Sequence, residues 1–320
     1  MSVPTEQQKT KCLIVGGSGF IGSHVVKALS KKDNYQIFVI GRSILPKQPL
    51  PESVRYIQFD INSDSIDRLL DQGFDQVIDL AYSSVPMTSF INPVQDVENN
   101  LPSAVNLIRA CSQLKLKKFL FISSGGTVYG NPLHLPIDES HPTNPMSPYG
   151  ITKLAVEKYA MMYHQLRGLP VVIVRPGNPY GPNQMGNLGQ GFVGTAIFSI
   201  LSGKTIQIFG EKGTIRDYIY ISDLADGIVA ALEFGIAGEV YNVGTGIGLD
   251  NRSIINEIGK IATLENYHLE VKNLPPRPFD VTANVLSSAR LTYVSGWKAM
   301  TDFRVGLDKT WEWAKQINYE

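Results

Sequence analysis

Cysteine is scarce in this 320-residue sequence, which contains only Cys12 and Cys111. Two cysteines cannot form a framework of several disulfides, and they do not supply the ligands of a typical zinc site. Cys12 lies in an apolar run and Cys111 lies in a helical pattern. We therefore expect two buried free thiols and no metal centre.

Long apolar runs are also missing from the chain. No apolar stretch reaches the about 18 residues that a membrane-spanning helix needs. The first residues, MSVPTEQQKTK, are polar and lack the apolar core of a signal peptide. The sequence therefore predicts a protein without a membrane partner, with a cytoplasmic location as the default.

Neither sign of charge is in excess, because 29 Lys plus Arg balance 29 Asp plus Glu. This balance argues against a nucleic-acid partner, although a local basic site for one small anion stays open. With 43% hydrophobic and 18% charged residues, the composition is that of an ordinary soluble globular protein. The length allows one or two domains.

What the chain does contain is an alternation of short apolar runs and helical patterns. Predicted strands lie at 12–16, 35–40, 54–59, 76–80, 119–123 and 171–175. Predicted helices lie near 20–31, 64–71, 93–113 and 148–167. The strand runs are continuously apolar, as expected for parallel strands that are covered on both faces. This order predicts a Rossmann-type doubly wound α/β sheet.

The composition changes after Pro176, where a loop rich in Gly, Pro and Asn begins. Further on we expect strands at 205–210 and 239–244, a strand and helix within 218–235, and helices at 191–203, 251–263 and 305–317. The strand at 239–244 could rejoin the main sheet. We therefore predict a dinucleotide-binding domain of residues 1–175, joined by about 216–245, and a smaller α+β lobe of residues 176–215 and 246–320.

A glycine-rich turn follows the first predicted strand. Gly16, Gly19 and Gly22 have the spacing G-x-x-G-x-x-G, with Phe20 and Ile21 at the start of the next helix. Glycines let the turn tighten and let backbone N–H groups approach a pyrophosphate, and the helix N-terminus adds partial positive charge. In this strand–turn–helix context the motif predicts a dinucleotide site.

The end of the second predicted strand usually selects between NAD and NADP. A ribose diol is commonly held there by Asp or Glu, whereas this chain has Gly41, Arg42 and Ser43. Arg42 could bind a 2′-phosphate, or it could be solvated while other groups hold the diol. NAD and NADP therefore both stay open.

The ends of the next strands provide further candidate cofactor contacts. They are Asp60 and Ile61 after the third strand, Ala81, Tyr82 and Ser83 after the fourth, and Ser123 after the fifth. Asp60 could accept a hydrogen bond from the adenine amino group, and the backbone of 81–83 would flank the pyrophosphate. Asn100, in the following helical segment, could brace the site.

A predicted helix begins at Ser147, a good N-cap residue, and contains Tyr149 and Lys153. Residues four apart lie on the same helix face. The ammonium of Lys153 would favour the phenolate and lower the tyrosine pKa, which would make Tyr149 usable as an acid or base near neutral pH. An ordinary surface pair has the same short pattern, so other residues must decide between the two.

Six segments together resemble the extended short-chain dehydrogenase/reductase superfamily, most closely its UDP-galactose 4-epimerase-like branch. They are GGSGFIGSH (16–24), FISSGGTVYG (121–130), SPYGITK (147–153), VRPGNPYGP (174–182), RDYIYISDLADG (216–227) and PPRPFD (275–280). They span nearly the whole chain in the family's order. The resemblance implies that Tyr149 is the acid/base and that Lys153 is its partner, which also holds the nicotinamide ribose.

In this family a hydroxyl residue of the strand-five loop bonds the sugar C4 oxygen, and that position falls on Gly125 here. Ser124 or Thr127 would have to supply the hydroxyl, and we favour the two jointly.

Three residues of the second lobe resemble the family's substrate-binding residues. Asn178 and Arg216 resemble residues that bind the sugar-nucleotide phosphates, and Arg277 resembles a second phosphate-facing arginine that Asp280 would orient. The arginine fork matches phosphate oxygens.

The leading hypothesis is an NAD(P)-dependent nucleotide-sugar 4-epimerase that inverts the C4 hydroxyl of a UDP-hexose through a transient 4-keto intermediate. The alternative is an NADPH-dependent 4-keto reductase of a 6-deoxy sugar carried by dTDP or GDP, which Arg42 and Gly125 favour. A non-catalytic nucleotide sensor is a third alternative, but the chain keeps both Tyr149 and Lys153. The resemblance also implies a homodimer formed through the helices at 93–113 and 148–167.

Overall fold

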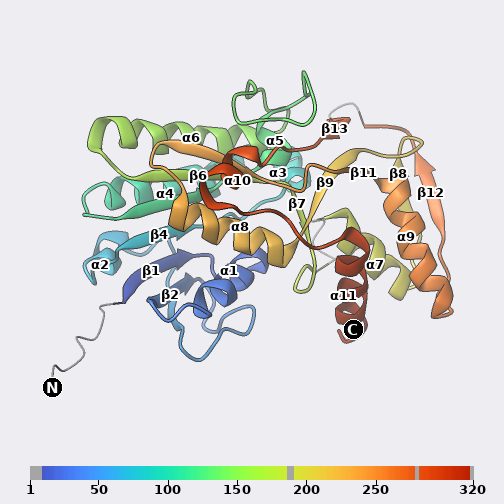
Figure 1. Ribbon diagram of the computed structural model, residues 1–320, viewed down its shortest axis with the longest axis horizontal. Coiled ribbons are helices and arrows are strands. Elements are labelled where there is room, and N and C mark those ends of the chain that lie inside the picture. The colour runs from blue at the N-terminus through green and yellow to red at the C-terminus, as the bar shows by residue number, and fades with distance from the viewer. Residues whose placement is uncertain (1–8, 186–190, 278–280, 318–320) are drawn as a thin grey trace.

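The computed structural model describes residues 9–185, 191–277 and 281–317. Its main element is a seven-stranded sheet in the order β10-β6-β5-β4-β1-β2-β3, in which every pairing is parallel. The strands are β1 (Thr10–Val15), β2 (Tyr35–Gly41), β3 (Arg55–Gln58), β4 (Gln76–Asp79), β5 (Lys118–Ile122), β6 (Val171–Pro176) and β10 (Glu239–Val243). Helices cover both faces (Figure 1). The predicted Rossmann-type fold is confirmed.

Successive residues of β1 point to opposite cores, because side chains alternate along a strand. Cys12 and Ile14 belong to the core under α1 (Phe20–Ser30) and α8 (Ile221–Phe234). Leu13 and Val15 belong to the core under α2 (Ile66–Leu70), α4 (Pro93–Cys111) and α6 (Pro148–Arg167). This burial on both faces explains why the strand sequences are continuously apolar.

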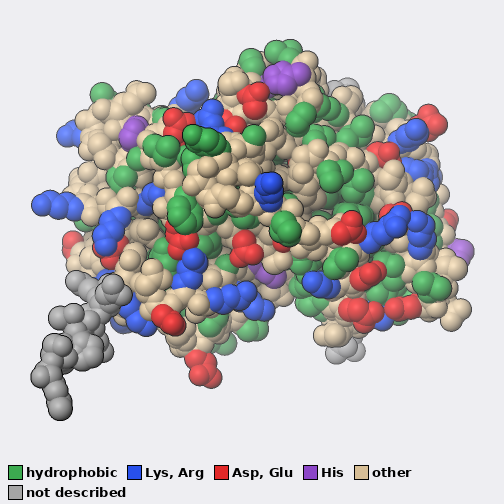
Figure 2. Space-filling model, in the orientation of Figure 1, with side chains coloured by type: hydrophobic (Ala, Val, Ile, Leu, Met, Phe, Trp, Pro, Cys, Tyr) green, Lys and Arg blue, Asp and Glu red, His purple; other side chains and the backbone are tan. Residues whose placement is uncertain are grey.

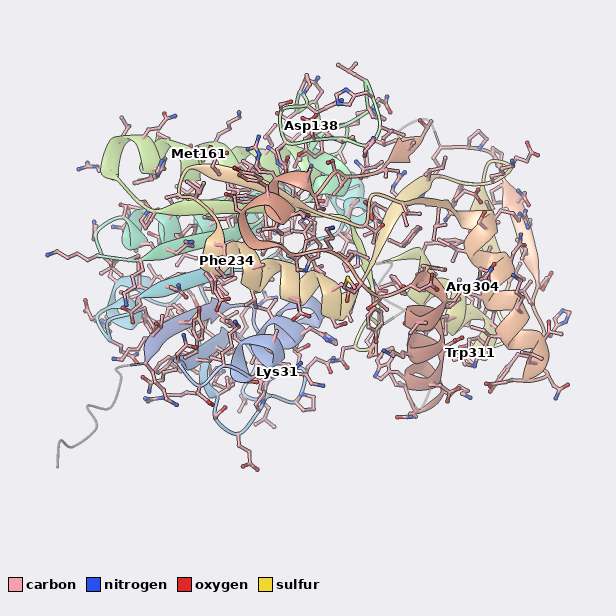
Figure 3. The ribbon with its side chains drawn as sticks, in the orientation of Figure 1. Lys31, Asp138, Met161, Phe234, Arg304 and Trp311 are labelled. Carbon is pink, nitrogen blue, oxygen red and sulfur yellow. The ribbon has the colours of Figure 1, made fainter. Side chains whose placement is uncertain are left out.

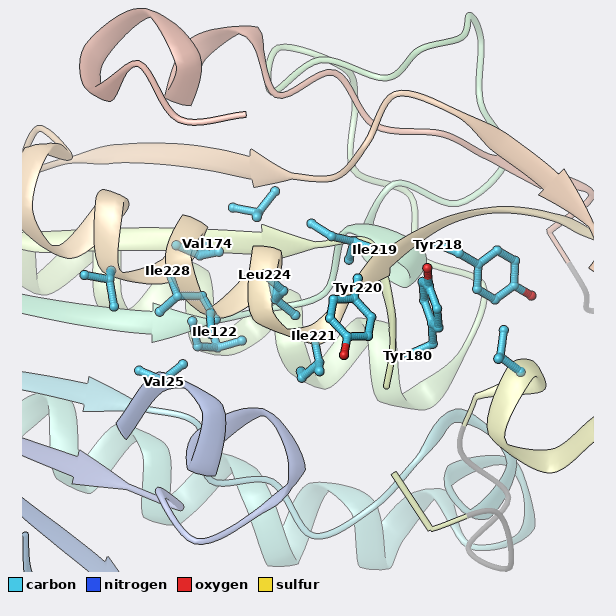
Figure 4. Packing of buried hydrophobic residues seen from close by; sticks show 14 of the residues in the cluster. Val25, Ile122, Val174, Tyr180, Tyr218, Ile219, Tyr220, Ile221, Leu224 and Ile228 are labelled. Carbon is cyan, nitrogen blue, oxygen red and sulfur yellow. The ribbon is translucent and has the colours of Figure 1, made fainter. Parts of the chain in front are cut away.

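The core under α1 and α8 fixes the positions of the strand ends beside the site. Figure 4 shows Val25 of α1, Ile122 of β5 and Val174 of β6 gathered near Leu224 and Ile228 of α8. All but Ile122, at 4%, are fully buried. Such close packing leaves little freedom to the loops that follow these strands.

The second lobe lies beyond the carboxyl ends of the main strands (Figure 1). One sheet contains β11 (Gly248–Asp250), β9 (Ile215–Tyr220) and β13 (Ala283–Asn284), and β7 (Asn178–Tyr180) also pairs with β9. A second sheet pairs β8 (Ile206–Phe209) with β12 (Val271–Leu274) in parallel. The helices of the lobe are α7 (Phe192–Leu201), α9 (Asn251–Leu264) and α11 (Phe303–Lys315).

Helix α11 ties the end of the chain to this lobe (Figure 3). Trp311 is fully buried and contacts the ring of Tyr267 edge-on, with centroids 5.5 Å apart. Arg304 forms a 2.9 Å ion pair with Glu257 of α9. The exposed pair contributes little, so the buried indole provides most of this attachment.

Several short elements were not predicted, namely α3 (Pro86–Ile91), α5 (Gly125–Val128), α10 (Ala289–Ser295), β7, β11, β12 and β13. They are too short to show a period, and the strands exist only because distant partners pair with them. Strand β10 rejoins the main sheet beside β6, as expected. Strand β9 differs from expectation, because it pairs within the second lobe although we assigned 216–245 to the main domain.

The surface and the thiols agree with the composition. Cys12 and Cys111 are both free and buried, as predicted. Basic and acidic side chains are mixed over the face shown in Figure 2, with no large patch of one sign. None of the described helices combines the length and the apolar character that crossing a membrane requires.

Candidate active site

A long groove follows the carboxyl ends of the main strands and continues over the second lobe. Its volume is about 1310 Å³, above the roughly 300–1,000 Å³ that suits one small ligand. Among the described residues that line it, five are cationic (Arg42, Lys47, Lys153, Arg216 and Arg277) and none is acidic. Size and charge therefore fit two ligands that each carry phosphate groups.

The groove brings together nearly all the site residues that the sequence predicts. It is lined by Gly16, Gly19, Phe20, Ile21, Gly22, Arg42, Ser43, Ile61, Ala81, Tyr82, Ser83, Asn100, Ser123, Ser124, Thr127, Tyr149, Lys153, Asn178, Arg216 and Arg277. Asp60 differs, because its Oδ1 accepts hydrogen bonds from the backbone and side chain of Asn62 and it does not line the groove. An acid in that turn caps its own backbone, which competes with reaching a ligand.

The glycine turn after β1 is shaped for a close approach of backbone. Gly16 has a φ of +77°, in the left-handed region that favours glycine. A Cβ on Gly22 would lie 2.4 Å from the carbonyl oxygen of Gly16, so α1 can pack against the turn only with glycine there. The N-terminus of α1 therefore faces the groove directly, which suits a pyrophosphate.

Tyr149 and Lys153 lie in the first two turns of α6. The helix starts as predicted, with the Ser147 side chain accepting a hydrogen bond from the Gly150 N–H at 3.1 Å. Lys153 is 3% exposed, and its Nζ donates to the Ile122 carbonyl oxygen at 2.8 Å. That Nζ also lies 4.1 Å from the ring centroid of Tyr82, a favourable cation–π distance.

The pKa of Tyr149 is shifted in the opposite direction from the one that the sequence predicted. Burial raises the pKa of Tyr149, and the charge of Asp96 raises it further, while a hydrogen bond with Ser124 lowers it. The groups of the protein itself therefore raise the pKa of Tyr149, and the prediction that Lys153 lowers it is wrong. The Lys153 ammonium is engaged by a backbone carbonyl and an aromatic face, and its Nζ lies 6.0 Å from the Tyr149 ring centroid.

Three buried carboxylates beside Lys153, those of Asp79, Asp96 and Glu157, were missed by the sequence reasoning. Burial lowers the pKa of Lys153 to about 8, and the charges of Asp79, Glu157 and Asp96 oppose that lowering. Asp79 ends β4, is 2% exposed and accepts a hydrogen bond from the Ala81 N–H at 3.1 Å. Burial raises its own pKa to about 6. An acid inside an apolar strand was the available signal, because buried acids are costly unless they have a partner.

Asp96 and Asn100, one turn apart on α4, hold the loop that follows β4. Thr152 Oγ1 donates to Asp96 at 2.7 Å, and the Ser83 N–H donates to Asn100 Oδ1 at 2.8 Å. The ring of Tyr82 meets that of Tyr149 edge-on, with centroids 4.8 Å apart. Asn100 thus braces the loop, as the sequence suggested. Asp96 is a further residue of this hydrogen-bond network that the sequence analysis did not predict.

The hydroxyl groups of the β5 loop explain the glycine at position 125. A Cβ there would lie 2.5 Å from the Leu286 side chain and 2.9 Å from the Pro176 carbonyl oxygen, so this position faces packed structure. Of these hydroxyls, that of Ser124 is the one that lowers the pKa of Tyr149. Ser123 Oγ and Thr127 Oγ1 are buried and have no hydrogen-bond partner among the described residues. Both residues line the groove, so these two unpartnered hydroxyls lie at its wall.

The residues predicted to bind the substrate come from two strands and one loop. Asn178 begins β7 and Arg216 lies on β9, where its Nη1 donates to the Ile215 carbonyl oxygen at 2.8 Å. The Arg277 guanidinium lies 4.1 Å from the ring centroid of Phe209 on β8. The predicted partner Asp280 lies outside the described residues. Pairing between distant strands therefore gathers both arginines at one end of the groove.

Within the described part of the chain, no three His, Cys, Asp or Glu side chains gather in a way that could hold a metal ion. The charged groups available to a ligand are therefore the five cations of the groove.

Comparison with known proteins agrees with this arrangement. Residues 12–244 match the model of the NAD dependent epimerase/dehydratase family. The UDP-glucose 4-epimerase of Mycolicibacterium smegmatis is 32% identical over 94% of this chain and 97% of its own length.

Two solved structures are similar over 96% of this chain and 99% of their own. The UDP-glucose 4-epimerase of Thermus thermophilus in complex with NAD has a TM-score of 0.87 at 32% identity. The UDP-glucuronic acid 4-epimerase of Bacillus cereus in complex with UDP-glucuronic acid and NAD has a TM-score of 0.86 at 30% identity.

Proposed function

Because this chain belongs to the NAD-dependent epimerase/dehydratase family, we propose that it interconverts the C4 epimers of a UDP-hexose with a bound dinucleotide. The observation that carries the proposal is the joining of two sites in one groove. The glycine turn with Lys153 lies in the main domain, the arginines 216 and 277 lie in the second lobe, and Tyr149 with its Ser124 partner lines the same groove.

The residues present fit a nicotinamide dinucleotide. Backbone N–H groups of the glycine turn and the N-terminus of α1 would hold the pyrophosphate. The ammonium of Lys153 and the unpartnered hydroxyl of Ser123 would meet the nicotinamide half. The chemistry that such a cofactor supplies when bound is reversible hydride exchange at C4 of the sugar, with a positive ring charge that favours the phenolate of Tyr149.

The residues of the chain manage the proton and the sugar. Tyr149 Oη takes the proton of the C4 hydroxyl as the 4-keto sugar forms, and it returns the proton after the sugar has turned over. The Ser124 and Thr127 hydroxyls hold the C4 oxygen. Arg216 and Arg277 bind the diphosphate, so that the nucleotide stays in place while the hexose rotates.

We infer a neutral hexose, because each cation that lines the groove among the described residues is proposed to have another task. Arg42 and Lys47 lie at the β2 end, Lys153 lies under Tyr82, and the two arginines lie at the second lobe. A uronic acid would bring a carboxylate that needs a further cation. The segment 186–190, GNLGQ, carries no charge in its sequence.

The test is conversion without net oxidation. The purified chain with either NAD or NADP should convert UDP-glucose into UDP-galactose to a constant ratio, measured by chromatography, with no net change in nicotinamide absorbance. UDP-glucuronic acid should convert far more slowly. No C4 conversion of any UDP-hexose would overturn the proposal. Stoichiometric consumption of NADPH with a 4-keto sugar would instead support the reductase alternative, to which the comparisons lend nothing.

We also propose that the chain forms a homodimer through an apolar strip on α4 and α6. Val94 and Val97 of α4 and Met162 and Leu166 of α6 are exposed by 38–73%, and the two helices pack side by side. A second copy would remove this apolar surface from water. Met162→Glu should convert a dimer into a monomer in analytical ultracentrifugation, whereas Leu264→Glu, on an exposed site of α9, should not. The cytoplasmic location stays a prediction from the sequence.

A further inference from the structure

We propose that the β2 end of the groove is built to bind a phosphate on the ribose 2′-oxygen, so that this chain binds NADP at least as tightly as NAD. The inference rests on the proposed use of the groove for a dinucleotide. It concerns a part of the groove that β1 and β4 separate from the β5 loop and Tyr149. The similar structures named above contain NAD, so the proposal rests on this chain's own residues.

The position that would hold a ribose diol has no room for an acid. Strand β2 ends at Gly41, where a diol-binding site commonly carries Asp or Glu. A Cβ at this position would lie 2.9 Å from the Tyr56 hydroxyl and 3.4 Å from Ser18 Oγ. Any side chain here would therefore have to displace the Tyr56 hydroxyl, which is bonded to the Ser43 carbonyl oxygen.

The acids of the neighbouring β3 turn do not replace it. Asp60 bonds Asn62, and Asp64 accepts a hydrogen bond from the Asp60 N–H at 2.7 Å. Their carboxylates are thus used within their own turn. No acidic side chain lines the groove among the described residues.

Two cations face the groove where the acid is missing. Arg42 directly follows Gly41, and Lys47 lies five residues further on in the same loop. Neither forms an ion pair with a carboxylate in the part of the chain that the structure describes. Ser43 adds a hydroxyl to the same wall. A phosphate dianion would meet a fork of N–H donors, an ammonium and a hydroxyl.

The loop that presents these groups is fixed against β3. The Phe59 N–H donates to the Gly41 carbonyl oxygen at 2.9 Å, and Gln58 Nε2 donates to the Arg42 carbonyl oxygen at 3.3 Å. The Tyr56 hydroxyl donates to the Ser43 carbonyl oxygen at 2.7 Å. Three successive carbonyl groups are thus tied down, so a bound phosphate would have to order only side chains.

Calorimetric titration of the full chain with NAD⁺ and NADP⁺ tests this directly. The nucleotide that purifies with the protein is identified first and then removed. Wild type should bind NADP⁺ at least as tightly as NAD⁺, and added salt should weaken NADP⁺ binding more. Arg42→Ala should weaken NADP⁺ binding by about tenfold or more while it changes NAD⁺ binding far less. Lys47→Ala should have a smaller effect of the same kind.

The matched control is Arg68→Ala, an exposed arginine on α2 that does not line the groove, and it should change neither affinity. The inference is overturned if wild type binds NAD⁺ about tenfold more tightly than NADP⁺, or if Arg42→Ala weakens both to the same degree. Conversion of UDP-glucose with NAD alone would leave the proposed function standing in that case. Tight NADP⁺ binding without C4 conversion of any sugar would overturn only the proposed function.

Discussion

The two ends of the groove are built in different ways. At the cofactor end, the walls are the loops that directly follow β1, β2, β4 and β5, so each wall adjoins its strand in the sequence. At the substrate end, the walls are β7, β8 and β9, which distant segments complete. Strand β12 pairs with β8 at a separation of 65 residues, and β13 pairs with β9 at a separation of 68 residues. The strands of the first end therefore carry their own apolar sequence patterns, whereas most strands of the second end are short and are recognised only by their pairing. Changes at the two ends should therefore have separable effects.

The largest expected effect lies at the boundary between the ends, at Tyr149. Tyr149→Phe removes only the hydroxyl that exchanges the proton, so kcat should fall by about 10²- to 10⁴-fold. Calorimetric affinities for the dinucleotide and for UDP should change little. Tyr159→Phe is the matched control, because Tyr159 lies on the same helix and is 40% exposed. A Tyr149→Phe enzyme with wild-type kcat would contradict the assigned role.

The next largest effect should separate the cofactor end from the rest. Gly22→Ala places a Cβ against the Gly16 carbonyl oxygen, so it should lower the free energy of unfolding by about 1–3 kcal/mol through overpacking and weaken dinucleotide binding strongly. Gly259→Ala is the control in the second lobe. A Cβ there would have the Leu269 side chain as its nearest neighbour, at 3.8 Å, and this helical substitution should stabilise the protein by about 0.5–1 kcal/mol. Thermal and denaturant unfolding measure both, and equal effects would contradict the packing argument.

A change at the substrate end should leave the affinity for the dinucleotide unchanged. Arg216→Ala removes charge-assisted hydrogen bonds to the diphosphate, so KM for the UDP-sugar should rise by about tenfold to hundredfold. Dinucleotide affinity should stay as in wild type. Arg304→Ala, whose side chain is 68% exposed beside Glu257, should change neither quantity. A rise in the dinucleotide Kd with Arg216→Ala would show that the two ends are not separable.

The smallest effect concerns the pH range of the enzyme. The charge of Asp79 helps to keep Lys153 protonated, because it opposes the lowering of the lysine pKa by burial. Asp79→Asn keeps the size and the acceptor for the Ala81 N–H but loses the charge. The Lys153 pKa should therefore fall below about 8, and the alkaline limit of kcat/KM should move to lower pH. Asp67→Asn, which breaks an exposed pair with Arg109, should leave the pH profile unchanged, and an unchanged profile in Asp79→Asn would contradict the coupling.

The signals that predicted the cofactor end were local and physical. The spacing of Gly16, Gly19 and Gly22 predicted the turn, and continuous apolar runs predicted strands buried on both faces. The position of Tyr149 and Lys153 on one helix face was predicted from a separation of four residues. Asp60 differed because a carboxylate after a strand can bond its own turn as readily as a ligand.

The order of residues was enough to predict the main α/β sheet, the glycine turn and the helix of Tyr149, because apolar runs, glycine spacing and a helix cap are each legible in a short stretch of sequence. Only the tertiary structure decided that Ser124 lies near Tyr149 while Gly125 packs against Leu286. It also decided that the charges of Asp79 and Asp96 act on Lys153. Finally, it decided that β9, which carries Arg216, pairs with β7 and not with the main sheet. The physical reason is that charge–charge interaction and burial depend on distances between segments far apart in sequence, which no local pattern encodes.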